Sequence, residues 1–188
     1  MPCGDCTACC TSSQFIHIEP DETGTISRIP KELLFPAPGL PRGDVVMGYD
    51  EHGHCPMFVD GRCSIYEHRP RTCRAYDCRV LPAAGLRPDR DETVGIARRT
   101  ERWRFAFPTE RDRRLQAAVQ AAATFLNDHR RELPEGAVPG NPTQLAFLAV
   151  QIHDVFLDGD DDPDRRRPVD PTLDVVATAV RRARSPRS

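Results

Sequence analysis

The chain has 188 residues, of which 39% are hydrophobic and 29% charged, and its formal net charge at pH 7 is −2. This length suits one domain, with or without an appended segment, and the near-neutral balance excludes the basic surface typical of nucleic-acid-binding proteins. No apolar run approaches the roughly 20 residues that span a bilayer, and residues 1–6 lack the pattern of a secretory signal. We therefore expect a cytoplasmic protein that contacts neither membrane nor nucleic acid.

All eight cysteines of the chain fall within its first 78 residues. Four of them open the chain as Cys3-x-x-Cys6-x-x-Cys9-Cys10, a run that supplies three sulfurs from one loop, as ferredoxin-type binding runs do. Consecutive residues rarely face one ion together. We therefore expect either Cys9 or Cys10 to bind a second ion, to bridge two ions, or to stay outside the ligand shell. In a cytosolic chain such a cysteine count indicates metal binding or catalysis, whereas in an exported chain it would indicate four disulfides.

Residues 55–66 are predicted to form a β-hairpin. Asp60-Gly61 is a favoured pair for a type I′ turn, because both residues tolerate a positive φ. Such a turn would fold Cys55 and Cys63 back towards each other.

A short helix is expected to follow the hairpin and to carry Cys73, because Pro70 suits the first position of a helix. Cys78 is five residues further on, about 140° around a helix, so we expect it just past the helix end. Cationic neighbours depress the pKa of thiols, and four arginines surround these two cysteines: Arg69, Arg71, Arg74 and Arg79. Three histidines near cysteines are alternative ligands: His52, His54 and His68.

The rest of the chain is predicted to contain strands and then helices. Residues 92–108 are expected to be strands, because the aromatic residues within 103–107 alternate with arginine and alanine. Apolar residues at helical spacing predict helices over 110–132 and 142–157, and Thr109 favours the start of the first.

The predicted fold class is α+β. It consists of an irregular, metal-nucleated N-terminal region with a β-hairpin, a small antiparallel sheet and about three C-terminal helices. We expect residues 1–80 to be the cysteine-cluster metal-binding region, and residues 81–157 to hold a strand pair with two helices packing on that region. Residues 158–188 are expected to form a charged linker and a short C-terminal helix.

The cysteines point to a thiolate-bound metal, because tetrathiolate sites are typical of zinc and of iron–sulfur clusters. Two groups of four sulfurs suit two mononuclear sites, a binuclear site, or one iron–sulfur cluster with spare thiols. The chain has no glycine-rich nucleotide loop and no His-Glu-x-x-His motif. The sequence therefore indicates zinc, with iron or an iron–sulfur cluster as the alternative, and it assigns no reaction.

The ordered cysteines, with Tyr66-x-x-Arg69-Pro70 between Cys63 and Cys73, resemble the YkgJ-type cysteine-cluster proteins, a zinc- or iron-chelating CxxCxxCC domain. The resemblance covers about residues 3–80. It implies that Tyr66, Arg69 and Pro70 shape the site from outside the ligand shell. It also implies that every cysteine is a candidate metal ligand: Cys3, Cys6, Cys9, Cys10, Cys55, Cys63, Cys73 and Cys78.

The leading functional hypothesis is a metal-binding protein whose metal is chiefly structural. Residues 1–80 show little apolar periodicity, and a structural zinc ion contributes roughly 10–16 kcal/mol of apparent binding energy to folding. The alternatives are an iron–sulfur redox protein or enzyme, and a carrier that delivers its metal to a client.

Overall fold

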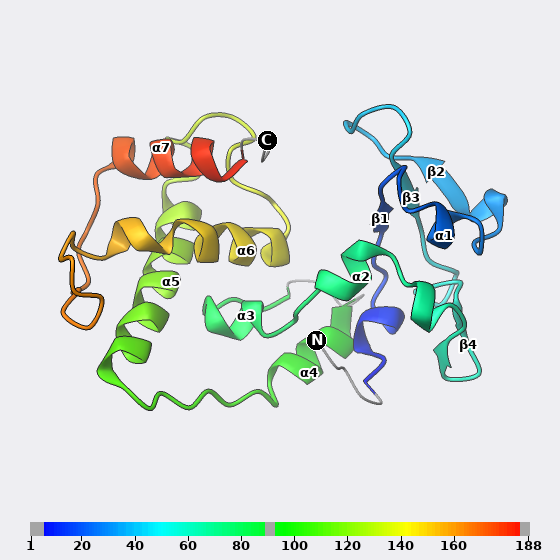
Figure 1. The fold of residues 1–188 in the computed structure, drawn as a ribbon, viewed down its shortest axis with the longest axis horizontal. Coiled ribbons are helices and arrows are strands. Elements are labelled where there is room, and N and C mark those ends of the chain that lie inside the picture. Colours follow the sequence, from blue (N-terminus) through cyan, green and yellow to red (C-terminus); the bar gives the residue numbers. More distant parts are fainter. Residues whose placement is uncertain (1–5, 89–92, 185–188) are drawn as a thin grey trace. The chain divides into compact units, whose positions relative to one another are not determined.

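The computed structural model describes residues 6–88 and 93–184 and is shown as a ribbon in Figure 1. The chain folds as two compact units. The first unit comprises Met1–Asp77 and Arg90–Arg99, and the second comprises Cys78–Asp89 and Thr100–Ser188. The fold is α+β, as predicted, because the first unit holds antiparallel strands and the second holds the longest helices. Within the described residues, no helix is both long and apolar enough to cross a bilayer.

The first unit is built on a three-stranded antiparallel sheet of β1 (Ile16–Ile18), β2 (Leu34–Pro36) and β3 (Val45–Met47). The strand order is β1-β3-β2, so β3 lies between the other two. Figure 1 shows the three strands side by side. The predicted small antiparallel sheet is confirmed, but it is formed by β1, β2 and β3 and not by residues within 92–108.

A small apolar core joins this sheet to the hairpin region of the first unit. Its buried members are Ile18, Ile29, Met47, Met57 and Ile65. Each comes from a different segment of the chain, so no window of the sequence shows a periodic pattern. The side chains of Cys55 and Cys63 pack against the same core.

The predicted hairpin is confirmed as β4 (Phe58–Val59) and β5 (Arg62–Cys63), which pair antiparallel. Asp60 and Gly61 between them have φ values of 50° and 75°, the positive values that a type I′ turn requires. The short helix η3 (Tyr66–His68) follows.

The predicted helix that carries Cys73 is also confirmed. It is α2 (Arg71–Ala75), and Pro70 occupies the position just before its first residue. Cys78 lies three residues beyond Ala75 and outside the helix, as expected from the spacing.

The prediction of strands over 92–108 is wrong. Residue 92 lies outside the described residues, Val94–Thr100 form helix α4, and residues 102–107 have no regular secondary structure. Ile96 and Thr100, one turn apart in α4, are 2% and 6% exposed, so helical spacing determines which side chains are buried here. The alternating aromatic residues that follow form no strand, and Phe105 is 38% exposed.

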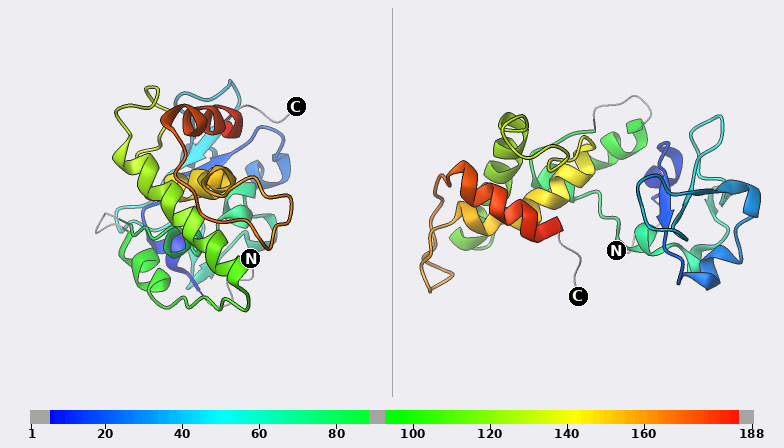
Figure 2. Two further views of the ribbon diagram at one scale, coloured as in Figure 1. Left: turned by 90° about the vertical axis from the view of Figure 1, so that its left-hand side faces the viewer. Right: turned by 90° about the horizontal axis from the view of Figure 1, so that it is seen from above.

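The second unit is helical, and its main helices match the predicted ones. The helices of this unit are α3 (Val80–Ala83), which was not predicted, and then α5 (Glu110–Asp128), α6 (Pro142–Ile152), η5 (His153–Phe156) and α7 (Leu173–Arg184). Helix α5 packs against α6 and η5, and α6 also packs against α3 and α7. Figure 2 shows α6 and α7 side by side in both views.

Helices α5 and α6 start at residues that cap them. Thr109 and Asp112 form a capping box at α5, in which the Thr109 hydroxyl accepts a hydrogen bond from the Asp112 N–H at 3.2 Å. At α6, the Asn141 side chain accepts the Thr143 N–H at 2.9 Å, and Pro142 fills the first helical position. Both starts lie where the sequence predicts them.

The remaining elements of the first unit are short: η1 (Ala8–Thr11), α1 (Thr23–Ile26) and η2 (Lys31–Leu33). Of these, η1 matters most for the site, because it contains the consecutive cysteines Cys9 and Cys10.

Candidate metal centre

Seven of the eight predicted ligands lie in the described part of the chain, and Cys3 lies outside it. Six of the seven belong to the first unit, whereas Cys78 belongs to the second. None of the seven is in a disulfide, and all are partly exposed.

Five thiols of the first unit lie close enough that the charges of some shift the pKa of others, and we call them the thiol cluster: Cys9, Cys10, Cys55, Cys63 and Cys73. Burial raises the pKa of Cys73 to about 12, and the negative charges of Cys9, Cys55 and Cys63 add to that rise. Burial likewise raises the pKa of Cys55. Several thiolates in one partly buried place repel each other, so a bound cation would allow them to ionise together.

Within the cluster, Cys9 and Cys10 form a thiol–thiol pair. The Cys10 thiol donates a hydrogen bond to the sulfur of Cys9, which lowers the pKa of Cys9 to about 7 and raises that of Cys10. The positive charge of Arg69 lowers the pKa of Cys9 further. The two consecutive cysteines therefore differ in pKa, and which of them would bind a metal stays a prediction.

Two backbone hydrogen bonds hold η1 beside the loop that leads to the hairpin. The Cys55 N–H donates to the Cys10 carbonyl at 2.8 Å, and the Ser13 N–H donates to the Gly53 carbonyl at 2.8 Å. A Cβ on Gly53 would lie 2.4 Å from Ser13 Oγ, and φ at Gly53 is +76°, so this position requires glycine. Segments about 45 residues apart in sequence thus bring Cys10 and Cys55 together.

Helix α4 packs closely on the other side of η1. The Ser12 hydroxyl is fully buried, donates to the Ala8 carbonyl at 2.5 Å and accepts the Ile96 N–H at 3.3 Å. A Cβ on Gly95 would lie 3.0 Å from Ser12 Oγ and 3.2 Å from the Ala8 carbonyl, which shows how close the two elements are. Only a small residue at 95 lets α4 fix the turn that carries Cys9 and Cys10.

The hairpin positions Cys55 and Cys63. The Phe58 N–H donates to the Cys55 carbonyl at 2.8 Å, and Phe58 is the cross-strand partner of Cys63. The loop before Cys55 is ordered by Asp50, whose carboxylate accepts the N–H groups of His54 at 2.8 Å and of His52 at 2.9 Å. These hydrogen bonds lower the pKa of Asp50.

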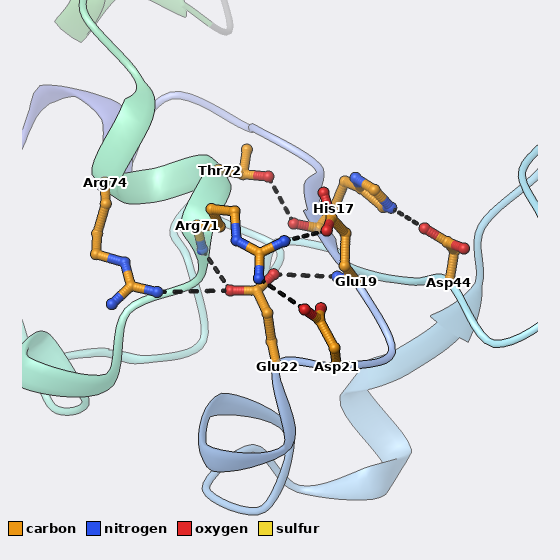
Figure 3. A network of polar contacts seen from close by, with 8 residues as sticks. All are labelled: His17, Glu19, Asp21, Glu22, Asp44, Arg71, Thr72 and Arg74. Atoms are coloured by element: carbon orange, nitrogen blue, oxygen red, sulfur yellow. Dashed lines mark hydrogen bonds and ion pairs between the residues drawn. The ribbon is translucent and has the colours of Figure 1, made fainter. Parts of the chain in front are cut away.

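Glu22 anchors the N-terminus of α2, the helix that carries Cys73 (Figure 3). One carboxylate oxygen accepts the Arg71 N–H at 2.6 Å, and the other accepts the Glu19 N–H at 3.0 Å. The Glu22 side chain is only 3% exposed. Pro70 provides no capping side chain, so this distant carboxylate satisfies a backbone donor that the helix leaves open. Sequence reasoning missed Glu22, because it lies 49 residues from Arg71.

Other polar contacts join α2 to strand β1 and its neighbours (Figure 3). The Thr72 hydroxyl donates to the His17 carbonyl at 2.7 Å, and the His17 ring lies 2.5 Å from a carboxylate oxygen of Asp44. The Arg71 guanidinium binds Glu19 and reaches Asp21 at 3.0 Å. Arg71 therefore fixes the helix and not the sulfurs.

Arg69 acts electrostatically on two thiols of the cluster. Its charge lowers the pKa of both Cys9 and Cys73. The guanidinium carbon lies 3.6 Å from the centre of the Tyr66 ring, a cation–π contact that holds the side chain in place. The ring thus orients the cation, and the cation favours the thiolate forms of Cys9 and Cys73.

Cys78 has different surroundings, in the second unit. The Trp103 indole N–H donates to its sulfur at 3.4 Å, and the Arg79 guanidinium lies 5.6 Å from the Trp103 ring centre. The sequence did not connect Trp103 with a cysteine, because it assigned Trp103 to a strand.

The histidines near the cysteines have other partners or lie at the surface. His54 packs edge-on against Phe58, with ring centres 5.9 Å apart, and the His52 side chain is 72% exposed. His68 is exposed at the end of η3, where its carbonyl accepts the Thr25 hydroxyl at 2.8 Å.

The donor chemistry of the cluster fits a soft or borderline metal. Among the described residues, no three histidine, cysteine, aspartate or glutamate side chains are already arranged to hold an ion. The cluster nevertheless offers five sulfurs, the ligands that zinc and iron–sulfur centres prefer. The buried Nε of Arg69 also has no hydrogen-bond partner in the described part of the chain, so a donor is available beside the sulfurs. Binding would replace the thiol–thiol hydrogen bond of Cys9 and Cys10.

Comparison with known proteins identifies the family of this chain. No curated protein and no solved structure matches it. Residues 2–95, half of the chain, match a family described as "CxxCxxCC: Putative zinc- or iron-chelating domain". This stretch contains the thiol cluster, α2 and Gly95 of α4, which lies against η1. The chain belongs to this CxxCxxCC family.

Proposed function

We propose that the first unit binds zinc through cysteine thiolates and that the metal is chiefly structural. The observation that carries this proposal is the thiol cluster, in which η1, the hairpin loop, β5 and α2 bring sulfurs from distant parts of the sequence together. The candidate ligands are Cys9, Cys10, Cys55, Cys63 and Cys73, with Cys3, Cys6 and Cys78 as further candidates. Zinc would supply positive charge and a fixed tetrahedral geometry, and it has no redox chemistry.

The size of the first unit supports a structural role. Its strands have two or three residues each, and its apolar core has five buried members. Domains with so little core are usually stabilised by a metal or by disulfides, and the described cysteines form no disulfides. A reducing, cytoplasmic setting would keep these thiols available for metal.

The test is to purify the full chain without oxygen and to measure zinc, iron and acid-labile sulfide per chain, with the visible absorption spectrum of the same sample. We expect zinc in stoichiometric amount and no visible chromophore. A brown sample that contains iron and sulfide would replace this proposal with an iron–sulfur protein. A sample that holds no metal and takes up none from buffered zinc would refute metal binding.

A pair of variants on one strand tests the assignment of the ligands. Cys63→Ser removes a sulfur of the cluster, whereas Arg62→Ser changes the exposed residue beside it. We expect Cys63→Ser to weaken zinc binding more than the roughly 10–100-fold typical of losing an outer hydrogen-bond partner. Arg62→Ser should bind as the parent protein does. Equal affinities for the two variants would remove Cys63 from the site.

A carrier function is the second candidate, and the partial exposure of all seven described cysteines favours it. A buried structural ion exchanges slowly, whereas a carrier must release its metal to a partner. Transfer of zinc to a competing chelator within minutes would support a carrier, and retention for hours would support the structural role.

A further inference from the structure

A second feature suited to binding lies in the helical unit, away from the cysteines of the first unit. A pocket of about 330 Å³ opens between the N-terminal half of α5, the helix η5 and the loop after it. Its charged and polar lining comes from Arg111, Arg114, Arg166, His153 and Asp154. The rest of the lining is apolar: Leu115, Leu157 and Pro163.

Two of the arginines lie on one face of α5, three residues apart, and most of their donors are unused. Within the described residues, Arg114 makes one hydrogen bond, from Nη2 to the Asp164 carbonyl, and its buried Nε has no partner. Arg111 makes no hydrogen bond to the described part of the protein, and its nearest carboxylate oxygen, on Asp164, is 3.9 Å away. A guanidinium carries five N–H donors, so many remain available for a ligand.

Arg166 faces the same pocket from the loop and is held rigidly. Its Nε donates to the Asp158 carbonyl at 2.9 Å, and its two terminal nitrogens donate to Asp154, one to the side chain at 3.1 Å and one to the carbonyl at 3.2 Å. This guanidinium is therefore already in place before any ligand arrives.

The charges of the lining do not balance. Three guanidinium groups share the lining with one carboxylate, that of Asp154, whose side chain is 66% exposed, and from outside the lining the Asp164 carboxylate pairs with Arg111 at 3.9 Å. Like charges one turn apart on a helix repel each other, and the N-terminal end of α5 adds partial positive charge. An anion bound between the arginines would relieve this repulsion, and paired N–H donors suit the two oxygens of a carboxylate or phosphate.

From this geometry we propose that the pocket binds a small organic anion, formed by one carboxylate or phosphate group on a compact apolar body. The volume is near the lower end of the range for ligand pockets, roughly 300–1,000 Å³. The arginines would hold the anionic group, and the apolar side chains would contact the body. The proposal does not depend on the metal centre.

The first experiment measures binding to the full chain by calorimetry at constant ionic strength. The probes are phenyl phosphate, benzoate, inorganic phosphate and benzyl alcohol. We expect at least one of the two aromatic anions to bind one per chain, and more tightly than inorganic phosphate and benzyl alcohol. Whichever of phenyl phosphate and benzoate binds more tightly shows whether the site prefers phosphate or carboxylate. Equal affinity for the neutral alcohol and the anions, or no binding of either anion, would overturn the proposal.

Three glutamine variants on the same helix then test the location. Arg114→Gln and Arg111→Gln should each weaken binding of the preferred anion about tenfold, the loss expected for one charge-assisted hydrogen bond. Arg113→Gln is the matched control, because this exposed side chain does not line the pocket and pairs with Glu110. Thermal melting checks that each variant is folded, and Arg111→Gln remains informative if Arg114→Gln unfolds. An equal loss in all three variants would overturn the site.

Discussion

At the scale of single residues, the thiol cluster contains sulfurs with very different tendencies to ionise. Cys9 has a pKa of about 7, because Cys10 donates a hydrogen bond to it and Arg69 lies near, whereas burial raises that of Cys73 to about 12. Thiolates and not thiols bind metal. If the cluster binds a metal, Cys9 would be the sulfur that ionises most easily in metal-free protein, and Cys73 would release its proton only as the ion binds.

This difference predicts the alkylation pattern of reduced, metal-free protein. With iodoacetamide pulses at a series of pH values and mass spectrometry of the peptides, Cys9 should reach half of its maximal rate near pH 7. Cys73 should react little below pH 9. Arg69→Gln removes a positive charge that favours the Cys9 thiolate, so the midpoint for Cys9 should move to higher pH.

Arg62→Gln is the control for this measurement, because Arg62 is an exposed arginine of the same unit. Its midpoint for Cys9 should match that of the parent protein. An unchanged midpoint in Arg69→Gln would mean that Arg69 has no electrostatic role at the cluster, and that the Tyr66–Arg69 contact serves packing alone.

At the scale of elements, α2 shows how a helix of five residues can position a candidate ligand, Cys73. Isolated helices of this length are unstable in water. The contacts that stabilise α2 must therefore come from other segments of the first unit. Glu22 accepts its first N–H, and Thr72 donates to the His17 carbonyl of β1. Cys73 lies next to Thr72, so the position of this sulfur depends on the sheet of the first unit.

Glu22→Ala should therefore affect both stability and metal binding. It leaves the Arg71 N–H without its acceptor and removes a buried charged partner, with an expected loss of about 1–3 kcal/mol in the free energy of unfolding. Zinc affinity should fall as well. Denaturant titration and a competitive zinc assay measure the two effects.

Glu32→Ala is the matched control, because Glu32 is an exposed glutamate of the same unit. It should change neither quantity measurably. Lower stability of Glu22→Ala with unchanged zinc affinity would separate α2 from the metal centre and would argue against Cys73 as a ligand.

Elements with local signals were predictable from the sequence, and elements made by distant contacts were not. Asp60-Gly61 determines the hairpin, and Thr109 with Asp112 determines the start of α5, each through neighbours in the chain. Strands of three residues, such as β1, are too short to show a period. For the same reason the cysteines indicate a candidate metal centre in the sequence, whereas Glu22 and Ser12, which contact its surroundings over 49 and 84 residues, carry no such signal.

At the scale of the whole molecule, the two units have unequal means of stabilisation. The first combines short strands with a small core, whereas the second has helices of up to 19 residues that pack on one another. The buried residues of the second unit include Ala122, Leu126, Leu148 and Val176. If the metal is structural, its removal should therefore affect the units differently.

We expect a chelator to unfold the first unit and to leave most of the helical signal of the second. All three tyrosines belong to the first unit, so near-ultraviolet circular dichroism from tyrosine reports on it: Tyr49, Tyr66 and Tyr76. The signal at 222 nm reports mainly on α5, α6 and α7. Tyrosine signal should be lost on chelation and return with added zinc, because ligand binding stabilises the folded state by a free energy that grows with the logarithm of the free metal concentration. Metal-free protein that keeps its tyrosine signal and melts unchanged would refute the structural role while leaving metal binding itself intact.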